Sequence, residues 1–143
     1  TGWVYDEGHW YYLLKDGGFD AGIDSLTVGE LARGWIKDYP LTYDEDKLKA
    51  APWYYLDPET GIMRTGWQYL GNRWYYLRSS GAMTTGWYQD GSTWYYLDNK
   101  NGDMTTGWFQ LNGKWYYAYS SGALAVNTTV DGYYINYNGE WVK

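Results

Sequence analysis

The sequence predicts an all-β repeat protein, built as a solenoid of stacked β-hairpins. The tripeptide Thr-Gly-Trp recurs at 65–67, 85–87 and 106–108, at intervals of 20 and 21 residues. A Trp-Tyr-Tyr triplet begins seven residues after the Trp of each motif. A Gly-x-apolar step then follows each triplet, as in Gly81-Ala82-Met83. One short supersecondary unit per repeat is therefore the expected building block.

Each unit is best explained as a hairpin followed by a loop. About 20 residues hold two short strands and two turns, but they cannot also accommodate a helix and its connections. Turn sequences such as Asp90-Gly91 and Asn112-Gly113 lie between the paired tryptophans, an arrangement typical of a tight β-hairpin. Because an isolated hairpin is barely stable in water, we expect successive hairpins to stack and bury aromatic faces against each other.

One stretch near residues 25–51 breaks the period and predicts a small helical insertion. It shows capping-box spacing twice, beginning at Thr27 and at Thr42, which favours helices at about 27–37 and 42–50. On this interpretation Trp35 packs the insertion and does not continue the repeat, although Gly34-Trp35 resembles the motif. The expected repeats are 1–23, 24–63 with the insertion, 64–83, 84–104, 105–124 and 125–143, the last an altered terminal cap.

The composition excludes several classes of function. The net charge of −6, with 11 basic against 17 acidic residues, disfavours a nucleic-acid partner. The absence of cysteine excludes disulfides, zinc-thiolate sites and a cysteine nucleophile. No apolar run is long enough to cross a membrane as a helix. Aromatic residues make up 22%, with 11 Trp and 19 Tyr against 2 Phe, so ring identity is expected to matter beyond bulk.

Nothing in the sequence predicts catalysis. The single histidine, His9, lies in a predicted hairpin turn and has no partner motif. The acidic run Asp44-Glu45-Asp46 lies where a helix would begin, and acidic groups there favour the helix dipole. There is no glycine-rich phosphate loop and no metal-ligand cluster. We therefore expect no catalytic residues, no cofactor and no metal.

The repeat does predict an aromatic binding site. Side chains alternate along a strand, so Trp74 and Tyr76 share one face and Tyr75 takes the other, packing face. Two tryptophans seven residues apart share a face of the hairpin. We expect the second Tyr of the next triplet to complete a three-walled box, while the first Tyr, as in Tyr95 and Tyr116, packs the stack. Ring faces attract quaternary ammonium groups, and several sites of millimolar affinity would hold a repeating ligand.

Three alternatives remain open. The rings could simply fill the core, although Phe or Leu would fill the same volume. The array could bind glucan, with sugar rings stacked on Trp and Tyr. It could also be a structural spacer, with the helical insertion as its recognition element.

The unit Thr-Gly-Trp, Trp-Tyr-Tyr, Gly-x-Met resembles the cell-wall-binding repeat of choline-binding proteins from pneumococci and their phages, over residues 1–23 and 53–143. The resemblance implies hairpins stacked in a left-handed superhelix, which bind choline or phosphocholine of teichoic and lipoteichoic acids between consecutive repeats. It also implies an extracellular module attached to the bacterial cell wall. In the longer parent protein the module is expected to be fused to another domain, often a cell-wall hydrolase.

The resemblance also assigns site residues. Carried onto this sequence, the choline boxes are Trp67, Trp74 and Tyr96; Trp87, Trp94 and Tyr117; and Trp108, Trp115 and Tyr134, with Met83 and Met104 as apolar floors. Two further groups depart from the pattern and are expected to be weaker: Trp3 and Trp10 with Tyr55, and Trp53 with Tyr76.

Overall fold

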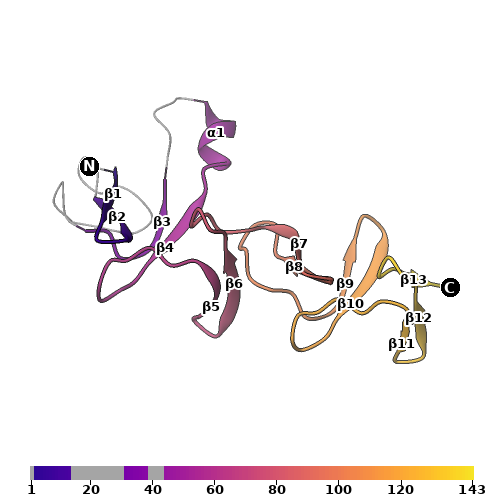
Figure 1. Ribbon diagram of the computed structural model, residues 1–143. Coiled ribbons are helices and arrows are strands. Elements are labelled where there is room, and N and C mark those ends of the chain that lie inside the picture. The colour runs from indigo at the N-terminus through magenta and orange to yellow at the C-terminus, as the bar shows by residue number, and fades with distance from the viewer. Residues whose placement is uncertain (1, 14–30, 39–43) are drawn as a thin grey trace. The chain divides into compact units, whose positions relative to one another are not determined.

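The computed structural model describes residues 2–13, 31–38 and 44–143. Over these residues the chain consists of antiparallel β-hairpins and one short helix, α1 (Glu45–Lys49) (Figure 1). The paired strands are β1 (Gly2–Asp6) with β2 (His9–Leu13), β3 (Gly34–Lys37) with β4 (Trp53–Leu56), β5 (Gly66–Leu70) with β6 (Arg73–Leu77), β7 (Gly86–Asp90) with β8 (Thr93–Leu97), β9 (Gly107–Leu111) with β10 (Lys114–Ala118), and β11 (Thr128–Val130) with β12 (Tyr133–Ile135) and β13 (Trp141–Val142). The predicted all-β hairpin fold class is confirmed. In the described part of the chain, no helix has the length and apolar character needed to cross a membrane.

Two-residue turns close the regular hairpins and fix their register. In the β9–β10 turn, Asn112 and Gly113 have φ values of 49° and 81°. A type I′ turn requires this left-handed conformation at both positions, which Asn and Gly tolerate best. Strand β7 extends one residue further than expected, so its turn is Gly91-Ser92 and not Asp90-Gly91. The even loop length keeps the two tryptophans of each hairpin on one face.

The chain divides into two compact units: Thr1–Gln68 with Tyr76–Met83, and Tyr69–Tyr75 with Thr84–Lys143. Within each unit, the loop after one hairpin is hydrogen-bonded to the hairpin before it. The donors are the backbone N–H groups of the apolar residues in the Gly-x-apolar steps, and the acceptors are carbonyls of the second tryptophans. These bonds run from Met63 to Trp10 and from Met83 to Trp53 in the first unit, and from Met104 to Trp74 and from Leu124 to Trp94 in the second, each 2.8 Å long.

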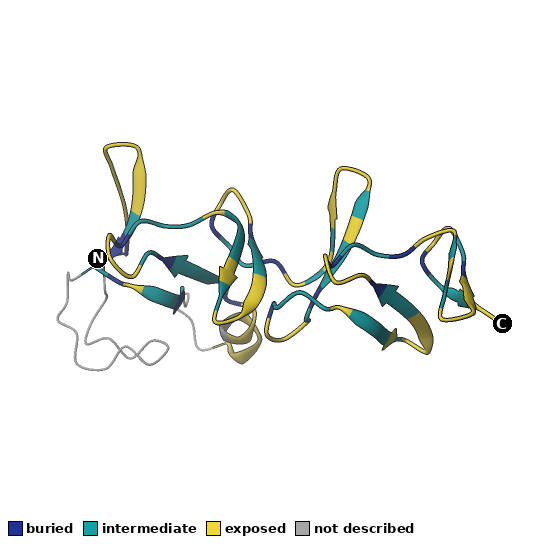
Figure 2. Ribbon diagram, turned by 90° about the horizontal axis from the view of Figure 1, so that it is seen from below, coloured by how far each residue is buried: buried dark blue, intermediate teal, exposed yellow. Residues whose placement is uncertain are grey.

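The buried core is thin and mostly aliphatic, with Tyr12 as a buried ring in the first unit. In five repeats the residue after the aromatic pair or triplet is 0–1% exposed: Leu56, Leu77, Leu97, Ala118 and Ile135. Leu13, in the same position of the first repeat, is only partly buried. Figure 2 shows buried residues at the bases of the hairpins and exposed ones at their turns. The tryptophan that opens each triplet stays partly open, as Trp94 at 39% and Trp115 at 37% exposure show. The alternative in which the rings merely fill the core is therefore wrong for these tryptophans.

The predicted first helix of the insertion is wrong where the structure describes it. Residues 34–37 form strand β3, in which Trp35 lies opposite Tyr55 of β4. Trp35 thus takes the repeat position that we had denied it, because pairing with β4 overrides the local capping signal at Thr27. Residues 31–33 are not helical either, and residues 27–30, where the predicted helix begins, lie outside the described residues.

The second helix is confirmed in a shorter form. Helix α1 lies within the predicted range 42–50. Its N-cap is Asp44, whose Oδ1 accepts a hydrogen bond of 2.9 Å from the backbone N–H of Asp46. The expected cap, Thr42, lies outside the described residues. Residues 38–52, which include α1, therefore connect β3 to β4 within one hairpin.

The glycine of the Gly-x-apolar step lets consecutive loops pack closely. A Cβ at Gly139 would lie 2.5 Å from Cδ2 and 3.0 Å from Cγ of Leu124, the apolar residue of the preceding loop. A Cβ at Gly122 would lie 2.2 Å from the Sδ of Met104. A Cβ at either position would force the Leu124 or Met104 side chain to shift, so packing as well as positive φ favours glycine here.

We expect Gly139→Ala to destabilise the protein more than Gly107→Ala. Both residues have positive φ, 82° and 79°, but a Cβ at Gly107 would meet open space. The left-handed backbone should lower the free energy of unfolding by about 1–2 kcal/mol in each variant. Overpacking should lower it by about 1–3 kcal/mol more in Gly139→Ala. Urea unfolding followed by tryptophan fluorescence measures both. Adding Leu124→Ala should make Gly139→Ala less costly; equal losses in the two glycine variants would contradict the packing.

The return loop after β4 is held by a carboxylate. Asp57 accepts hydrogen bonds from Arg64 Nη2 at 2.6 Å and from the backbone N–H groups of Glu59 and Thr60 at 2.8 and 2.9 Å. The Arg64 bond, followed by the two backbone bonds, holds the pKa of Asp57 well below its usual range. The ionised form therefore contributes to the stability of the loop.

This lowered pKa predicts a pH dependence. The contribution of Asp57 is full above its unfolded-state pKa of about 3.9 and is lost as the pH falls toward the folded-state pKa. The free energy of unfolding should therefore fall between about pH 5 and pH 2, and less steeply in Asp57→Asn. Arg64→Gln should flatten the dependence in the same direction. Parallel curves for the wild type and both variants in urea unfolding would refute this role.

Candidate functional site

Three pockets in the described residues share one construction. Each lies between the two tryptophans of a hairpin and groups supplied by later repeats, chiefly the following one. The Trp3 pocket of the first unit has a volume of about 340 Å³ and is lined by Trp3, Trp10, Tyr54, Met63, Ser79 and Ser80. In the second unit, the Trp87 pocket, about 350 Å³, is lined by Trp87, Trp94, Tyr116, Leu124, Val126, Tyr137 and Asn138, and the Trp108 pocket, about 400 Å³, by Trp108, Trp115, Tyr133 and Trp141.

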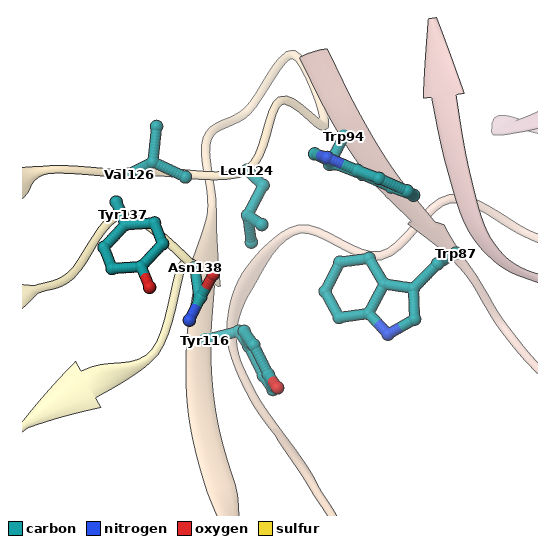
Figure 3. A pocket seen from close by; sticks show the side chains of 7 residues that line it. All are labelled: Trp87, Trp94, Tyr116, Leu124, Val126, Tyr137 and Asn138. Carbon is teal, nitrogen blue, oxygen red and sulfur yellow. The ribbon is translucent and has the colours of Figure 1, made fainter. Parts of the chain in front are cut away.

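The two tryptophans of a hairpin form perpendicular walls. In β7–β8, Trp87 lies opposite Tyr96 and Trp94 lies opposite Gln89. This register places the two tryptophans diagonally on one face, as the seven-residue spacing predicts. Their ring centroids are 6.3 Å apart and the ring planes meet at 88°. Figure 3 shows both indoles bordering the hollow, with the Tyr116 ring nearby.

The third wall is the first Tyr of the next triplet and not the second. The centroid of Tyr116 lies 5.1 Å from that of Trp87. Tyr117, which we expected there, lies opposite Trp108 in its own hairpin, with centroids 5.1 Å apart. Because side chains alternate along β10, Tyr116 and Tyr117 face opposite ways. The tryptophan face of one hairpin therefore meets the opposite face of the next, which corrects our assignment of Tyr116 to packing alone.

The other two pockets show the same exchange. The ring centroid of Tyr54 lies 4.7 Å from that of Trp3. Tyr55, the expected partner, packs against Trp35 instead. In the terminal repeat the ring centroid of Tyr133 lies 5.8 Å from that of Trp108. The expected Tyr134 lies opposite Thr129 in the β11–β12 hairpin and does not line the pocket.

The second Tyr of each triplet supports the first tryptophan of its own hairpin. The two rings meet edge to face, an arrangement that aromatic pairs favour. The centroid distances are 5.0–5.1 Å for Trp3–Tyr12, Trp35–Tyr55, Trp67–Tyr76, Trp87–Tyr96 and Trp108–Tyr117. Tyr55, Tyr76, Tyr96 and Tyr117, predicted as box walls, thus each support the first tryptophan of their own hairpin.

The apolar residue of the Gly-x-apolar step supplies a further side of each pocket. Met63, Leu124 and Trp141 take this position in the Trp3, Trp87 and Trp108 pockets. Sequence reasoning missed Trp141, although Gly139-Glu140-Trp141 repeats the step and could have revealed it.

Some predicted groups remain untested. Met83 and Met104 take the same step position as Met63 but line none of these three pockets. The group Trp67, Trp74 and Tyr96 draws on both units and stays a prediction.

Trp53, predicted in a weaker site, has a cation of the protein on its ring. The ammonium of Lys37 lies 5.9 Å from the Trp53 centroid. It also donates a hydrogen bond of 3.2 Å to the carbonyl of Lys49 in α1. The helix thus holds an internal cation over this tryptophan.

The electrostatic character of the pockets favours a cation. None of the residues that line them is charged. The indole Nε1 of Trp3 donates to Asp38 and that of Trp108 donates to Asp131, which puts negative charge next to two pockets. Burial, and secondly the charge of Asp38, raise the pKa of Tyr54, so this wall stays a neutral phenol. Within the described residues, no cluster of acidic and histidine side chains could hold a metal.

Comparisons with known proteins agree with this construction. The family model for "Choline-binding repeat" matches residues 64–109, and that for "Putative cell wall binding repeat" matches residues 1–19 and 106–124. No curated protein matches the chain.

Solved structures extend the similarity. Choline binding protein F from Streptococcus pneumoniae is 55% identical, with a TM-score of 0.64 over 100% of this chain and 57% of that one. The choline binding domain of Spr1274 in Streptococcus pneumoniae is 53% identical over 56% of this chain and 96% of that domain, with a TM-score of 0.53. The pneumococcal cell wall endolysin from phage Cp-1, solved with choline, is 30% identical over 98% of this chain and 36% of that one, with a TM-score of 0.55. The chain thus spans less than three fifths of the length of choline binding protein F.

Proposed function

Because the chain belongs to the choline-binding repeat family, we propose that this non-catalytic binding module attaches a protein to the cell wall by holding choline residues in its aromatic pockets. The observation that carries the proposal is the right-angled pair of tryptophans closed by a tyrosine. In the Trp87 pocket, Trp87 and Trp94 meet at 88°, and Tyr116 lies 5.1 Å from Trp87.

A quaternary ammonium group suits such a pocket. It cannot donate a hydrogen bond from nitrogen, so it loses less hydration than a primary ammonium group does when it leaves water for uncharged walls. Each ring face contributes about 0.5–2 kcal/mol, depending on how far water is excluded. Part of this gain is offset by the lost freedom of the ligand. Millimolar affinity, about −4 kcal/mol, is therefore the expected strength of one pocket.

Several pockets on one chain suit a ligand that repeats. The phosphocholine groups of teichoic and lipoteichoic acids would present many choline residues along one polymer. Once one pocket is occupied, the next binds at a high effective concentration, and weak sites together give firm attachment. The proposal places the module outside the cell, on the bacterial wall. It also allows the rest of the parent protein to be a cell-wall hydrolase or another domain.

Carbohydrate binding is the second candidate, and one observation favours it. Ser79 and Ser80 line the Trp3 pocket, and Asn138 lines the Trp87 pocket, so both offer polar groups beside the rings. A glucan ring would need such groups for its hydroxyls. The Trp108 pocket has no such side chain in its lining. Elution from a diethylaminoethyl matrix by choline would favour the first function, and elution by oligosaccharide alone would favour the second.

We expect Trp94→Ala to weaken choline binding at the Trp87 pocket at least fivefold, since one of three cation–π walls is lost. Tyr119→Ala removes a ring of 42% exposure that lines no described pocket, and it should leave choline binding at the Trp87 pocket unchanged. Choline titration followed by the indole ¹H–¹⁵N signal of Trp87 measures both. If the module is only a spacer, Trp94→Ala will lower stability without changing choline affinity, and the proposal fails.

The identity of the third wall gives a sharper prediction. Tyr116→Ala should weaken choline at the Trp87 signal about 5- to 30-fold, whereas Tyr116→Phe keeps the ring face and should bind within about twofold of the wild type. Tyr117→Ala removes the ring behind Trp108, so its main effect should appear at the Trp108 signal. A Tyr117→Ala variant that weakens the Trp87 site as much as Tyr116→Ala would contradict the assignment.

A further inference from the structure

Two of the three pockets have a carboxylate attached to a tryptophan wall. Asp131 Oδ2 accepts a hydrogen bond of 3.0 Å from Trp108 Nε1. Asp38 Oδ2 accepts one of 3.2 Å from Trp3 Nε1, and its Oδ1 accepts one of 3.1 Å from the hydroxyl of Tyr12. In each case the aspartate belongs to the hairpin that follows the tryptophan: Asp38 directly follows β3 and Asp131 lies in the β11–β12 turn.

The Trp87 pocket lacks this feature. Among the described residues, no side chain accepts a hydrogen bond from the Trp87 indole. Its lining includes the neutral Tyr137 and Asn138. The chain therefore contains its own comparison: two pockets with a carboxylate on a tryptophan wall, and one without.

The other charged groups near the Trp108 pocket do not replace Asp131. Lys114 and Glu140 form an ion pair with each other. The Lys143 ammonium lies 5.5 Å from the Trp141 centroid, so a cation of the protein already lies near one wall of this pocket. Asp131 is thus the carboxylate bonded directly to a wall.

A carboxylate in this position acts on a bound cation in two ways. Its charge-assisted hydrogen bond fixes the plane of the indole ring. Its negative charge also lies about 7 Å from an ammonium group placed over the ring, since cation–π contacts keep the cation within about 6 Å of the centroid. With an effective dielectric constant of about 40–80, attraction over this distance raises the affinity about three- to eightfold.

We propose that Asp38 and Asp131 are specificity-determining residues that make the Trp3 and Trp108 pockets select for positive charge more strongly than the Trp87 pocket, where the ring faces alone attract the cation. This inference rests on the proposed choline function. It predicts that the pockets differ in how well they distinguish choline from a neutral molecule of the same shape.

The test uses Asp131→Asn in the full chain. Asparagine keeps an oxygen that accepts the Trp108 hydrogen bond and tolerates the φ of 52° at this turn position, so the variant removes mainly the charge. The probes are choline and its neutral carbon isostere, 3,3-dimethylbutan-1-ol. The readouts are the indole ¹H–¹⁵N signals of Trp108 and Trp87, assigned through Trp→Phe variants.

We expect Asp131→Asn to lower the affinity for choline about three- to eightfold at the Trp108 signal. The affinity for the isostere at the same signal should stay within about twofold of the wild type. Choline at the Trp87 signal should not change. Raising the NaCl concentration from 20 to 500 mM should weaken choline at Trp108 more in the wild type than in the variant, because salt screens the charge. Asp38→Asn, read at the Trp3 signal, is the second variant and should show the same separation of the two probes.

The inference is overturned if Asp131→Asn binds choline as tightly as the wild type. It is also overturned if choline and the isostere weaken equally, because Asp131 would then act only by orienting the ring. A wild-type protein in which choline moves neither the Trp108 nor the Trp87 signal would instead refute the proposed function itself. The two failures are therefore distinguishable.

Discussion

The structure depends on a backbone hydrogen bond between repeats. A hairpin of two five-residue strands cannot bury enough surface to be stable alone. The loop after each hairpin therefore donates an N–H to the carbonyl of the preceding hairpin's second tryptophan, at 2.8 Å in each of four cases. The same loop residue is the apolar side of a pocket in two of them, Met63 and Leu124. One contact thus joins the repeats and completes the site, so the site needs no separate scaffold.

The two tyrosines of each triplet contact tryptophans of different hairpins. The second, such as Tyr96, packs edge to face on the first tryptophan of its own hairpin and fixes that ring. The first, such as Tyr116, crosses to the previous hairpin and completes its pocket. Phe109 stacks between Tyr96 and Tyr116, with centroids 5.5 and 5.6 Å away, so wall and support form one continuous aromatic layer. The rings can therefore stay half-exposed and still be held in position.

Sequence periodicity predicted what lies within a hairpin better than what lies between hairpins. The seven-residue spacing placed Trp87 and Trp94 on one face because alternation along strands is a local rule. Tertiary packing decides which face of a hairpin meets the next one, and no local rule predicts it. The sequence therefore predicted Tyr117 as the third wall, a position that Tyr116 takes. Trp35 was misassigned because local capping signals outweighed the Gly-Trp motif. Trp141 lies outside the Trp-Tyr-Tyr pattern, and only the Gly-x-apolar step of the last repeat indicates its position.

Sharing each pocket between neighbours has a consequence for how such chains lengthen. One repeat cut out of the array would contain half a pocket, so the smallest fragment that holds all the aromatic walls comprises two hairpins and the return loop of the second. Conversely, a duplication of about 20 residues brings both the tryptophan pair for a new pocket and the tyrosine that its neighbour needs. The number of pockets can thus grow by whole units through simple genetic copying, with no intermediate that carries an unfinished pocket.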